Sequence, residues 1–149
     1  MKKAILENYF RSKCFYWIDV GYFRKEINKM QKYVNNWPKP DKCLADDRIV
    51  MGQVKLFSEQ EKKLIINFDR HAHYRLRGRT NVAGGFFGGQ IKNTLKFINL
   101  YYYTIKLFLK NKKFIGKDQN IFTYIAFAHP EVVQLIFFRT YFGFKKYLA

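Results

Sequence analysis

The chain has 149 residues, of which 48% are hydrophobic, so it is long and apolar enough to form one domain with a buried core. Lys and Arg number 28 against 11 Asp and Glu, which gives a formal net charge of +17. This composition excludes an intrinsically disordered chain, and the charge favours anionic partners such as phosphorylated sugars or anionic lipid. The basic residues are spread along the chain without a recognisable reader motif, which argues against a nucleic-acid partner.

Neither the cysteines nor the apolar segments indicate a disulfide scaffold or a membrane-spanning protein. Cys14 and Cys43 form no Cys-x-x-Cys pair, which excludes a zinc finger and is compatible with reduced thiols. The apolar segment 91–109 is interrupted by Lys92, Lys96 and Lys106, so we expect no spanning helix. We therefore expect a cytoplasmic protein, with peripheral association at the inner face of the membrane as an option.

The first half of the chain alternates strand-like and helix-like segments. An aromatic and β-branched run at residues 14–18 predicts a buried strand. The lysine-rich segment after Arg24 predicts a helix, and residues 49–57 predict a second strand. Ser58 and Glu61 have the spacing of a capping box and therefore predict the start of a short helix.

The second half contains a glycine-rich segment followed by helices. Residues 81–89 read Asn-Val-Ala-Gly-Gly-Phe-Phe-Gly-Gly and follow a polar, basic stretch, 69–81, that we expect to be an exposed loop. Apolar residues recur at steps of four and three between residues 91 and 109, as Ile91, Leu95, Ile98, Tyr102, Ile105 and Leu109, which predicts one apolar stripe of a helix.

Two further helices are predicted near the end of the chain. Asp118 is a suitable N-cap for a helix that runs to about Ala128. Pro130 fits the first turn of another helix. The order of strand-like and helix-like segments predicts an α/β fold with a small sheet.

Asp19 stands at the carboxyl end of the first predicted strand and is followed by Gly21. Open α/β sheets bind ligands at this position, and a carboxylate there suits a hard divalent ion such as Mn²⁺ or Mg²⁺ together with substrate phosphate oxygens. Arg24 would then pair with a phosphate or with Asp19 itself. The alternative is that Asp19 only caps the following turn.

Asp118 and Gln119 bring hydrogen-bond acceptors and donors that suit sugar hydroxyls. Asp118 could also act as the general base for an attacking hydroxyl. Helix capping alone is the alternative, and the two roles are compatible. His71 and His73 have no third ligand near them in sequence, so solvated loop histidines are favoured there over a metal site.

The glycine-rich segment has two interpretations. Its glycines Gly84, Gly85, Gly88 and Gly89 permit positive φ and close approach of a ligand, and the helix that follows offers its N-terminus to an anion. The spacing matches neither a P-loop nor a dinucleotide-binding fingerprint. The alternative is a tight turn that packs a helix closely on a strand.

Four segments taken together, 17–24, 81–89, 115–120 and 129–131, resemble the HtrL/YibB family in order and spacing. The resemblance covers the chain from about Asn8 onward. The family is associated with genes for lipopolysaccharide or other surface glycans and looks like glycosyltransferases of the GT-A type. The resemblance therefore implies a partial GT-A-like (Rossmann-like) domain with a small mixed sheet and flanking helices.

The resemblance also implies roles for individual residues. Asp19 matches the acidic motif that holds a divalent metal and the donor diphosphate, although Gly21 stands where a second acidic residue is common. Residues 81–89 would line the donor-sugar and acceptor side. The implied activity is sugar transfer from a nucleotide-sugar donor to a glycan or lipid-linked acceptor. Asp118 would be the catalytic residue, and Arg24, Asn81, Gly84, Gly85, Gly88, Gly89 and Gln119 would bind substrate.

Family members usually carry a substantial region before the segment that holds Asp19, whereas residues 1–15 precede it here. In GT-A folds that region supplies the first strands and the pocket for the nucleotide base. We therefore expect residues 1–149 to be a single domain that corresponds to the carboxyl-terminal part of such a fold. The alternative function is that of a non-catalytic, truncated basic protein that binds anionic glycan, lipid or nucleic acid.

Overall fold

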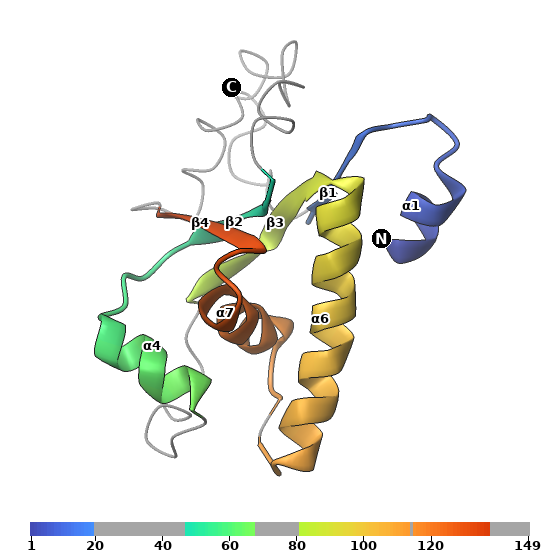
Figure 1. The fold of residues 1–149 in the computed structure, drawn as a ribbon. Helices are drawn as coiled ribbons and strands as arrows, with labels where there is room; N and C mark the ends of the chain where they lie inside the picture. The colour runs from blue at the N-terminus through green and yellow to red at the C-terminus, as the bar shows by residue number, and fades with distance from the viewer. Residues whose placement is uncertain (20–46, 68–80, 114, 138–149) are drawn as a thin grey trace.

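The computed structural model describes residues 1–19, 47–67, 81–113 and 115–137. In this part of the chain, helices flank a four-stranded mixed sheet (Figure 1), which confirms the α/β class expected from the sequence. The elements in chain order are α1 (Lys2–Glu7), β1 (Cys14–Ile18), β2 (Ile49–Gln53), α4 (Glu59–Ile66), β3 (Val82–Gln90), α6 (Ile91–Lys110), α7 (Asp118–Ala128) and β4 (Val133–Phe137).

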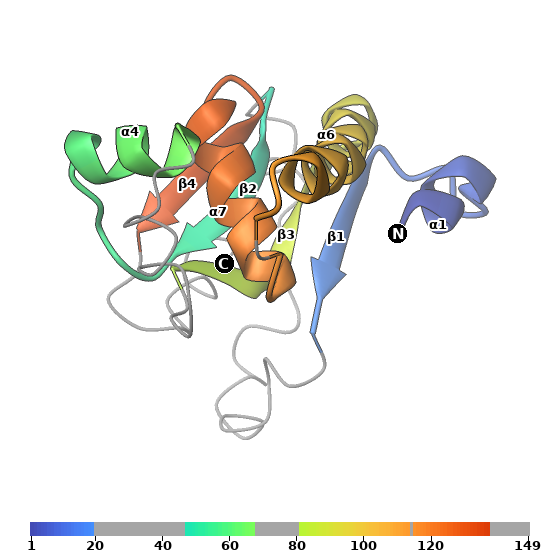
Figure 2. The same ribbon diagram turned by 90° about the horizontal axis from the view of Figure 1, so that it is seen from below.

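The sheet has the strand order β1-β3-β2-β4. β3 runs antiparallel to both β1 and β2, whereas β2 and β4 are parallel. Trp17 and Met51 both pair with Phe87, so the three side chains share one face of the sheet. Figure 2 shows that α4, α6 and α7 cover the sheet from one side.

The glycine-rich segment 81–89 forms nearly all of β3 and is an extended strand instead of a tight turn. Its glycines allow close packing: a Cβ added at Gly88 would lie 2.6 Å from the Cα and 2.7 Å from the Cδ1 of Tyr16 on β1. Within the described ranges, the glycine with positive φ is Gly116, at 59°. The expectation of positive φ in the segment is therefore wrong, because an extended strand needs glycine here for space.

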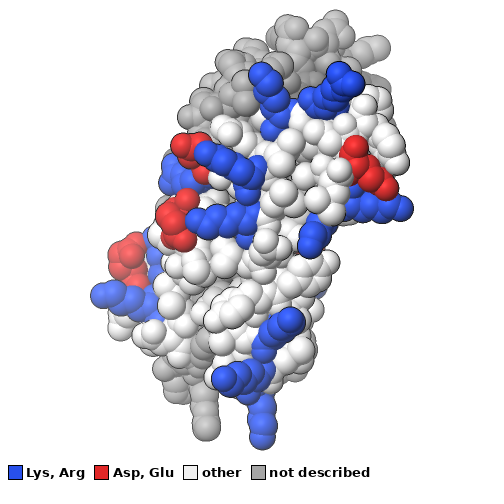
Figure 3. Space-filling view, turned by 45° about the vertical axis from the view of Figure 1, so that its right-hand side comes forward, with Lys and Arg blue, Asp and Glu red and all other residues white. Residues whose placement is uncertain are grey.

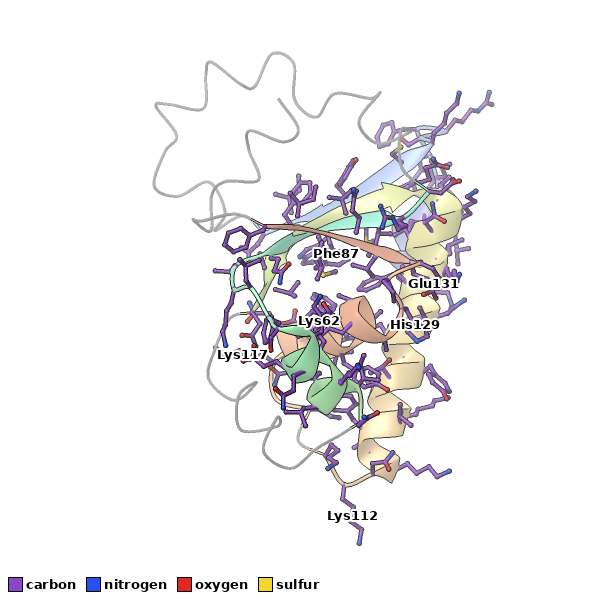
Figure 4. All side chains as sticks on the ribbon, turned by 60° about the vertical axis from the view of Figure 1, so that its left-hand side comes forward. Lys62, Phe87, Lys112, Lys117, His129 and Glu131 are labelled. Carbon is purple, nitrogen blue, oxygen red and sulfur yellow. The ribbon has the colours of Figure 1, made fainter. Side chains whose placement is uncertain are left out.

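The core lies between the sheet and the helices. Residues 120–127 of α7 are all buried. Phe87 lies between the sheet and the helices (Figure 4), where its ring centroid is 5.5 Å from that of Phe97 on α6 and 5.1 Å from that of Phe122 on α7. These aromatic contacts join β3 to both helices.

Helix α6 has the predicted extent but is rotated relative to the predicted apolar stripe. Ile98 of that stripe is buried, whereas Tyr102 and Leu109 are 56% and 62% exposed. The buried face includes Phe97 and Phe108, each 1% exposed. Apolar residues occur on several sides of this helix, so the sequence periodicity alone could not identify the buried face. Packing against the aromatic core determines which face is buried.

The remaining element predictions had mixed outcomes. Residues 14–18 form a strand as predicted, but the second strand ends at Gln53 instead of reaching residue 57. The capping box is confirmed, because Ser58 Oγ accepts a hydrogen bond from the Glu61 N–H at 3.2 Å and the Glu61 carboxylate accepts one from the Ser58 N–H at 3.0 Å. The helix expected at Pro130 is wrong, since the chain turns there and enters β4, which pairs with β2.

Two expectations about the chain's surroundings can also be compared with the structure. Cys14 is disulfide-bonded, so the expectation of reduced thiols is wrong. In the described part of the chain, no helix has the length and apolar character that a membrane crossing requires. The helix predicted after Arg24 and the loop predicted at 69–81, apart from Asn81, lie outside the described residues.

Candidate functional site

Residues from three distant parts of the sequence meet at one end of β3. Asp19 follows β1, and its N–H donates a hydrogen bond to the Gly85 carbonyl at 2.8 Å. Gly84 faces the first turn of α7, where an added Cβ would lie 3.1 Å from Gln119 Cγ and 3.7 Å from Asp118 Oδ1. We call Asp19, Gly84, Gly85, Asp118 and Gln119 the strand-end cluster.

The strand-end cluster forms where β3 leaves the regular ladder with β2. Met51 pairs with Phe87, but the next residue, Gly52, pairs with Ala83, so residues 84–86 are skipped on the β3 side. Such a bulge bends a strand and changes the direction of its side chains, and bulges are common beside active sites. At Gly84 a side chain would press on Gln119, so glycine keeps the backbone of β3 close to the start of α7.

The start of α7 supplies the polar side chains of the cluster. The helix begins at Asp118 with Lys117 as its N-cap, so the predicted cap is one residue too late. Gly116, with its φ of 59°, turns the chain toward this helix start. Asp118 Oδ1 accepts a hydrogen bond from the Gln119 N–H at 2.8 Å, and its carboxylate sits favourably at the positive end of the helix dipole. Asp118 and Asp19 are both exposed to solvent.

An aromatic pocket of about 150 Å³ lies one helical turn along α7 from Asp118, with no residue of the cluster in its lining. One of its walls is Phe122, which lies one helical turn after Asp118. Trp17 lies opposite Phe87 in the β1–β3 ladder and is 47% exposed, so it extends this aromatic surface toward Asp19. The pocket is lined by Met1, Lys2, Phe87, Phe97, Ile98, Tyr101, Tyr102 and Phe122.

The electrostatics of Tyr101 connect the pocket with the cluster. Burial raises the pKa of the Tyr101 phenol, and the negative charge of Asp118 and then Tyr102 raise it further. The charge of Asp118 therefore acts on a side chain that lines the pocket.

Several residues predicted to bind substrate do not join the cluster. Gly88 and Gly89 lie toward the other end of β3, packed against β1 and against Ile49 on β2. Asn81 is 1% exposed, so its side chain does not reach the surface. Arg24 lies outside the described residues, as do His71 and His73.

The N-terminus of α6, expected to face an anion, is also remote from the cluster. The N–H of Ile91 donates to the carbonyl of Lys13 at 3.2 Å. Lys13 precedes β1, whereas Asp19 follows it, so the two lie at opposite ends of that strand. The helix start that reaches the cluster is that of α7.

Comparison with known proteins identifies the family. Residues 1–148 match the family model described as "Bacterial protein of unknown function (HtrL_YibB)". The chain belongs to the HtrL/YibB family. No curated protein and no solved structure matches it significantly. The family match covers both the strand-end cluster and the aromatic pocket of this HtrL/YibB protein.

Among the described residues, the cluster offers two carboxylates to a metal ion. Within the described ranges, no group of three or more His, Cys, Asp or Glu side chains is placed to hold a metal ion. The carboxylates of this HtrL/YibB cluster are those of Asp19 and Asp118. Mg²⁺ is commonly bound by one or two carboxylates together with substrate phosphates, so these residues fit an ion that arrives with a diphosphate.

The aromatic pocket is the feature that sequence reasoning missed. The aromatic content of 19% does not by itself indicate where the aromatic side chains gather. Tyr101 and Phe122 lie on different helices, and only the packing of both helices on β3 brings them together. A sequence signal that could have drawn attention to the region is the run of three tyrosines that begins at Tyr101.

Proposed function

We propose that this HtrL/YibB protein is a glycosyltransferase of GT-A type, or part of one, that transfers a sugar from a nucleotide-sugar to a lipopolysaccharide or another surface glycan. The main support is the convergence of Asp19, Asp118 and Gln119 beside the glycine pair of β3 and an aromatic pocket. Carboxylates and amides bind sugar hydroxyls, and concave aromatic sites with few polar groups are typical ligand pockets. The net charge of +17 also favours a phosphorylated substrate.

In this proposal Asp118 is the catalytic residue. Its exposed carboxylate accepts the proton of the acceptor hydroxyl while the acceptor oxygen bonds to the anomeric carbon and the bond to the donor diphosphate breaks. The hydrogen bond from the Gln119 N–H fixes one carboxylate oxygen in place. Gln119 itself would orient a sugar hydroxyl, and Gly84 would leave room for the sugar ring against β3.

Asp19 would hold the donor diphosphate at the opposite side of the cluster. Bound Mn²⁺ or Mg²⁺ would neutralise the charge that develops on the leaving diphosphate. Asp19 is fixed by its backbone hydrogen bond to Gly85, so its position depends on the β1–β3 pairing. Arg24 belongs to the proposal as a phosphate ligand on sequence grounds.

Calorimetry with a panel of UDP-, GDP- and CMP-sugars in the presence of Mn²⁺ tests donor binding, and release of the free nucleotide reports turnover. We expect Asp118→Asn to retain donor binding but to lower turnover by about 100-fold or more, the usual range for loss of a general base. Asp19→Asn should weaken Mn²⁺-dependent donor binding. Asp47→Asn is the matched control, because Asp47 is exposed and pairs with Lys92 at 3.1 Å, near the start of α6.

Two results would contradict the proposal. One is a folded protein that binds no nucleotide-sugar in the panel, which would support the alternative of a non-catalytic basic protein. The other is Asp118→Asn turnover equal to that of the unmodified protein and of Asp47→Asn. Circular dichroism of each variant distinguishes these results from loss of the fold.

A further inference from the structure

Large apolar side chains are exposed on and after α1. Leu6 is 68% exposed, and Tyr9 and Phe10, which follow the helix, are 79% and 92% exposed. Single exposed apolar residues are ordinary, but a group of this size on one short segment marks a contact surface. The same segment carries the basic residues Lys2, Lys3, Arg11 and Lys13.

The exposed side of α6 continues this surface. α1 packs against α6, and Met1 and Tyr102 line the same pocket. Tyr102, Lys106, Leu109 and Lys110 are spaced so that they fall on one face of the helix. All of them are exposed. We call this face of α6, together with residues 2–13, the α1–α6 face.

The charge of the α1–α6 face is strongly positive. α6 contains no acidic residue over its 20 positions. In Figure 3, the basic side chains at the lower end of the molecule, where α6 ends, have no acidic side chain beside them. Lys112 follows α6 and points away from the rest of the protein (Figure 4). The ion pair on α1, between Lys3 and Glu7 at 3.7 Å, neutralises only one of the basic residues of that segment.

We propose that the α1–α6 face docks on the surface of an anionic phospholipid bilayer. Aromatic and aliphatic tips flanked by lysines are the composition that lies in a lipid–water interface, where basic residues also interact with anionic headgroups. Leu6 and Leu109 have no planar ring to stack on a nucleic-acid base, so their exposure favours lipid over nucleic acid. α6 is about 30 Å long and offers an extended contact.

Docking in this orientation would also place the aromatic pocket near the bilayer. Met1, Lys2 and Tyr102 belong both to the pocket lining and to the α1–α6 face or its edge. A lipid-linked acceptor could then reach Asp118 while its lipid stays in the membrane. This consequence rests on the proposed function, whereas docking itself does not.

Vesicle co-sedimentation of the full chain tests the proposal, with phosphatidylcholine vesicles compared with vesicles that contain phosphatidylglycerol as well. We expect binding to the anionic vesicles only, weakened by added salt. Phe10→Ser should weaken it about tenfold or more, since burial of such a side chain contributes roughly 1.5–3 kcal/mol and about 1.4 kcal/mol corresponds to tenfold. The double variant Lys106→Gln/Lys110→Gln should weaken it about 25-fold, from about 1 kcal/mol for each basic residue near the surface.

Matched controls come from the region of α4, which lies on the other side of the molecule from α1 (Figure 1). Leu56→Ser removes an apolar side chain that is 62% exposed, and Lys55→Gln/Lys63→Gln removes the same charge as the α6 double variant. We expect both controls to bind anionic vesicles like the unmodified protein.

Three outcomes would overturn the proposal: no binding to anionic vesicles, equal binding to neutral vesicles, or equal losses in the α1–α6 variants and the controls. The same variants titrated with a single-stranded oligonucleotide give a further criterion. If the α6 lysines were needed for the oligonucleotide but not for vesicles, the face would be a nucleic-acid surface. Because vesicle binding needs no sugar donor, its failure is distinguishable from failure of the glycosyltransferase proposal.

Discussion

Substitution of the β3 glycines by alanine should separate packing from ligand binding. At Gly88 the new Cβ would lie 2.6 Å from Tyr16 Cα, and the obstacle is backbone, which cannot move without displacing β1. At Gly89 the nearest atoms are the Arg48 carbonyl oxygen at 3.1 Å and Ile49 Cα at 3.3 Å, also backbone but less close. At Gly84 the nearest atom is the Cγ of the flexible Gln119 side chain at 3.1 Å.

These distances give an order of effects on the free energy of unfolding. Gly88→Ala should cost about 3 kcal/mol or more, because overpacking that moves backbone lies at the upper end of the usual 1–3 kcal/mol. Gly89→Ala should cost roughly 1 kcal/mol. Gly84→Ala should be within about 1 kcal/mol of the unmodified protein, since Gln119 can move and alanine restricts the unfolded chain more than glycine does.

Urea unfolding followed by circular dichroism measures this order, and donor binding by calorimetry supplies the second readout. We expect Gly84→Ala to change donor binding while it remains stable, and Gly89→Ala to bind donor normally despite its lower stability. Equal stability of all three variants would refute the packing role of Gly88. Equal loss of donor binding in stable Gly84→Ala and Gly89→Ala proteins would indicate a ligand loop along the whole segment.

Two further predictions concern buried groups. Among the described residues the Thr104 hydroxyl is buried without a hydrogen-bond partner, so Thr104→Val should stabilise the protein by about 1 kcal/mol. Thr94→Val should destabilise it by about 1 kcal/mol, because Thr94 donates a hydrogen bond to the Gln90 carbonyl at 3.0 Å. Urea unfolding midpoints test both variants, and a Thr104→Val protein less stable than the unmodified protein would contradict the first expectation. Burial raises the pKa values of Tyr101 and Tyr124 above 10.0 in the folded protein. Their contribution to the free energy of unfolding should therefore be complete below pH 10 and should decline as pH rises through the pKa values of the folded state. Ultraviolet absorbance of tyrosinate is the check, and ionisation of both tyrosines in the folded protein at the pH where free tyrosine ionises would contradict this.

Part of the candidate site could be predicted from sequence because open α/β sheets bind ligands at the carboxyl ends of their strands. Asp19 follows a short aromatic run, and a carboxylate in that place is expected at the ligand edge of a sheet. Asp118 was recognisable from helix-start preferences. That Asp19 meets Gly85 while Asp118 meets Gly84 could not be predicted, because these contacts depend on the β3 bulge and on how α7 packs across the sheet.

Other features were hidden because the same residue types serve two purposes. Glycine allows both positive φ and close strand packing, so the sequence left the role of Gly88 open and only the approach of Tyr16 decides it. Asn81 is polar, yet it is buried: its backbone carbonyl accepts a hydrogen bond from the Val54 N–H at 2.9 Å, and its side-chain Oδ1 has no hydrogen-bond partner among the described residues. Likewise, the solvent-exposed face of α6 carries large apolar side chains, so the sequence pattern placed Tyr102 on the buried face although it is exposed.

The most direct test of the strand-end cluster is an amide NMR spectrum of the protein titrated with a nucleotide-sugar and the diamagnetic ion Mg²⁺. The signals of Gly84, Gly85 and Gln119 should shift together as the donor is added, because they meet at one end of β3. Those of Gly88 and Ile91, toward the other end, should stay in place. Shifts confined to Gly88 and Ile91, or no shifts at all in the folded protein, would contradict a single ligand site at the strand-end cluster.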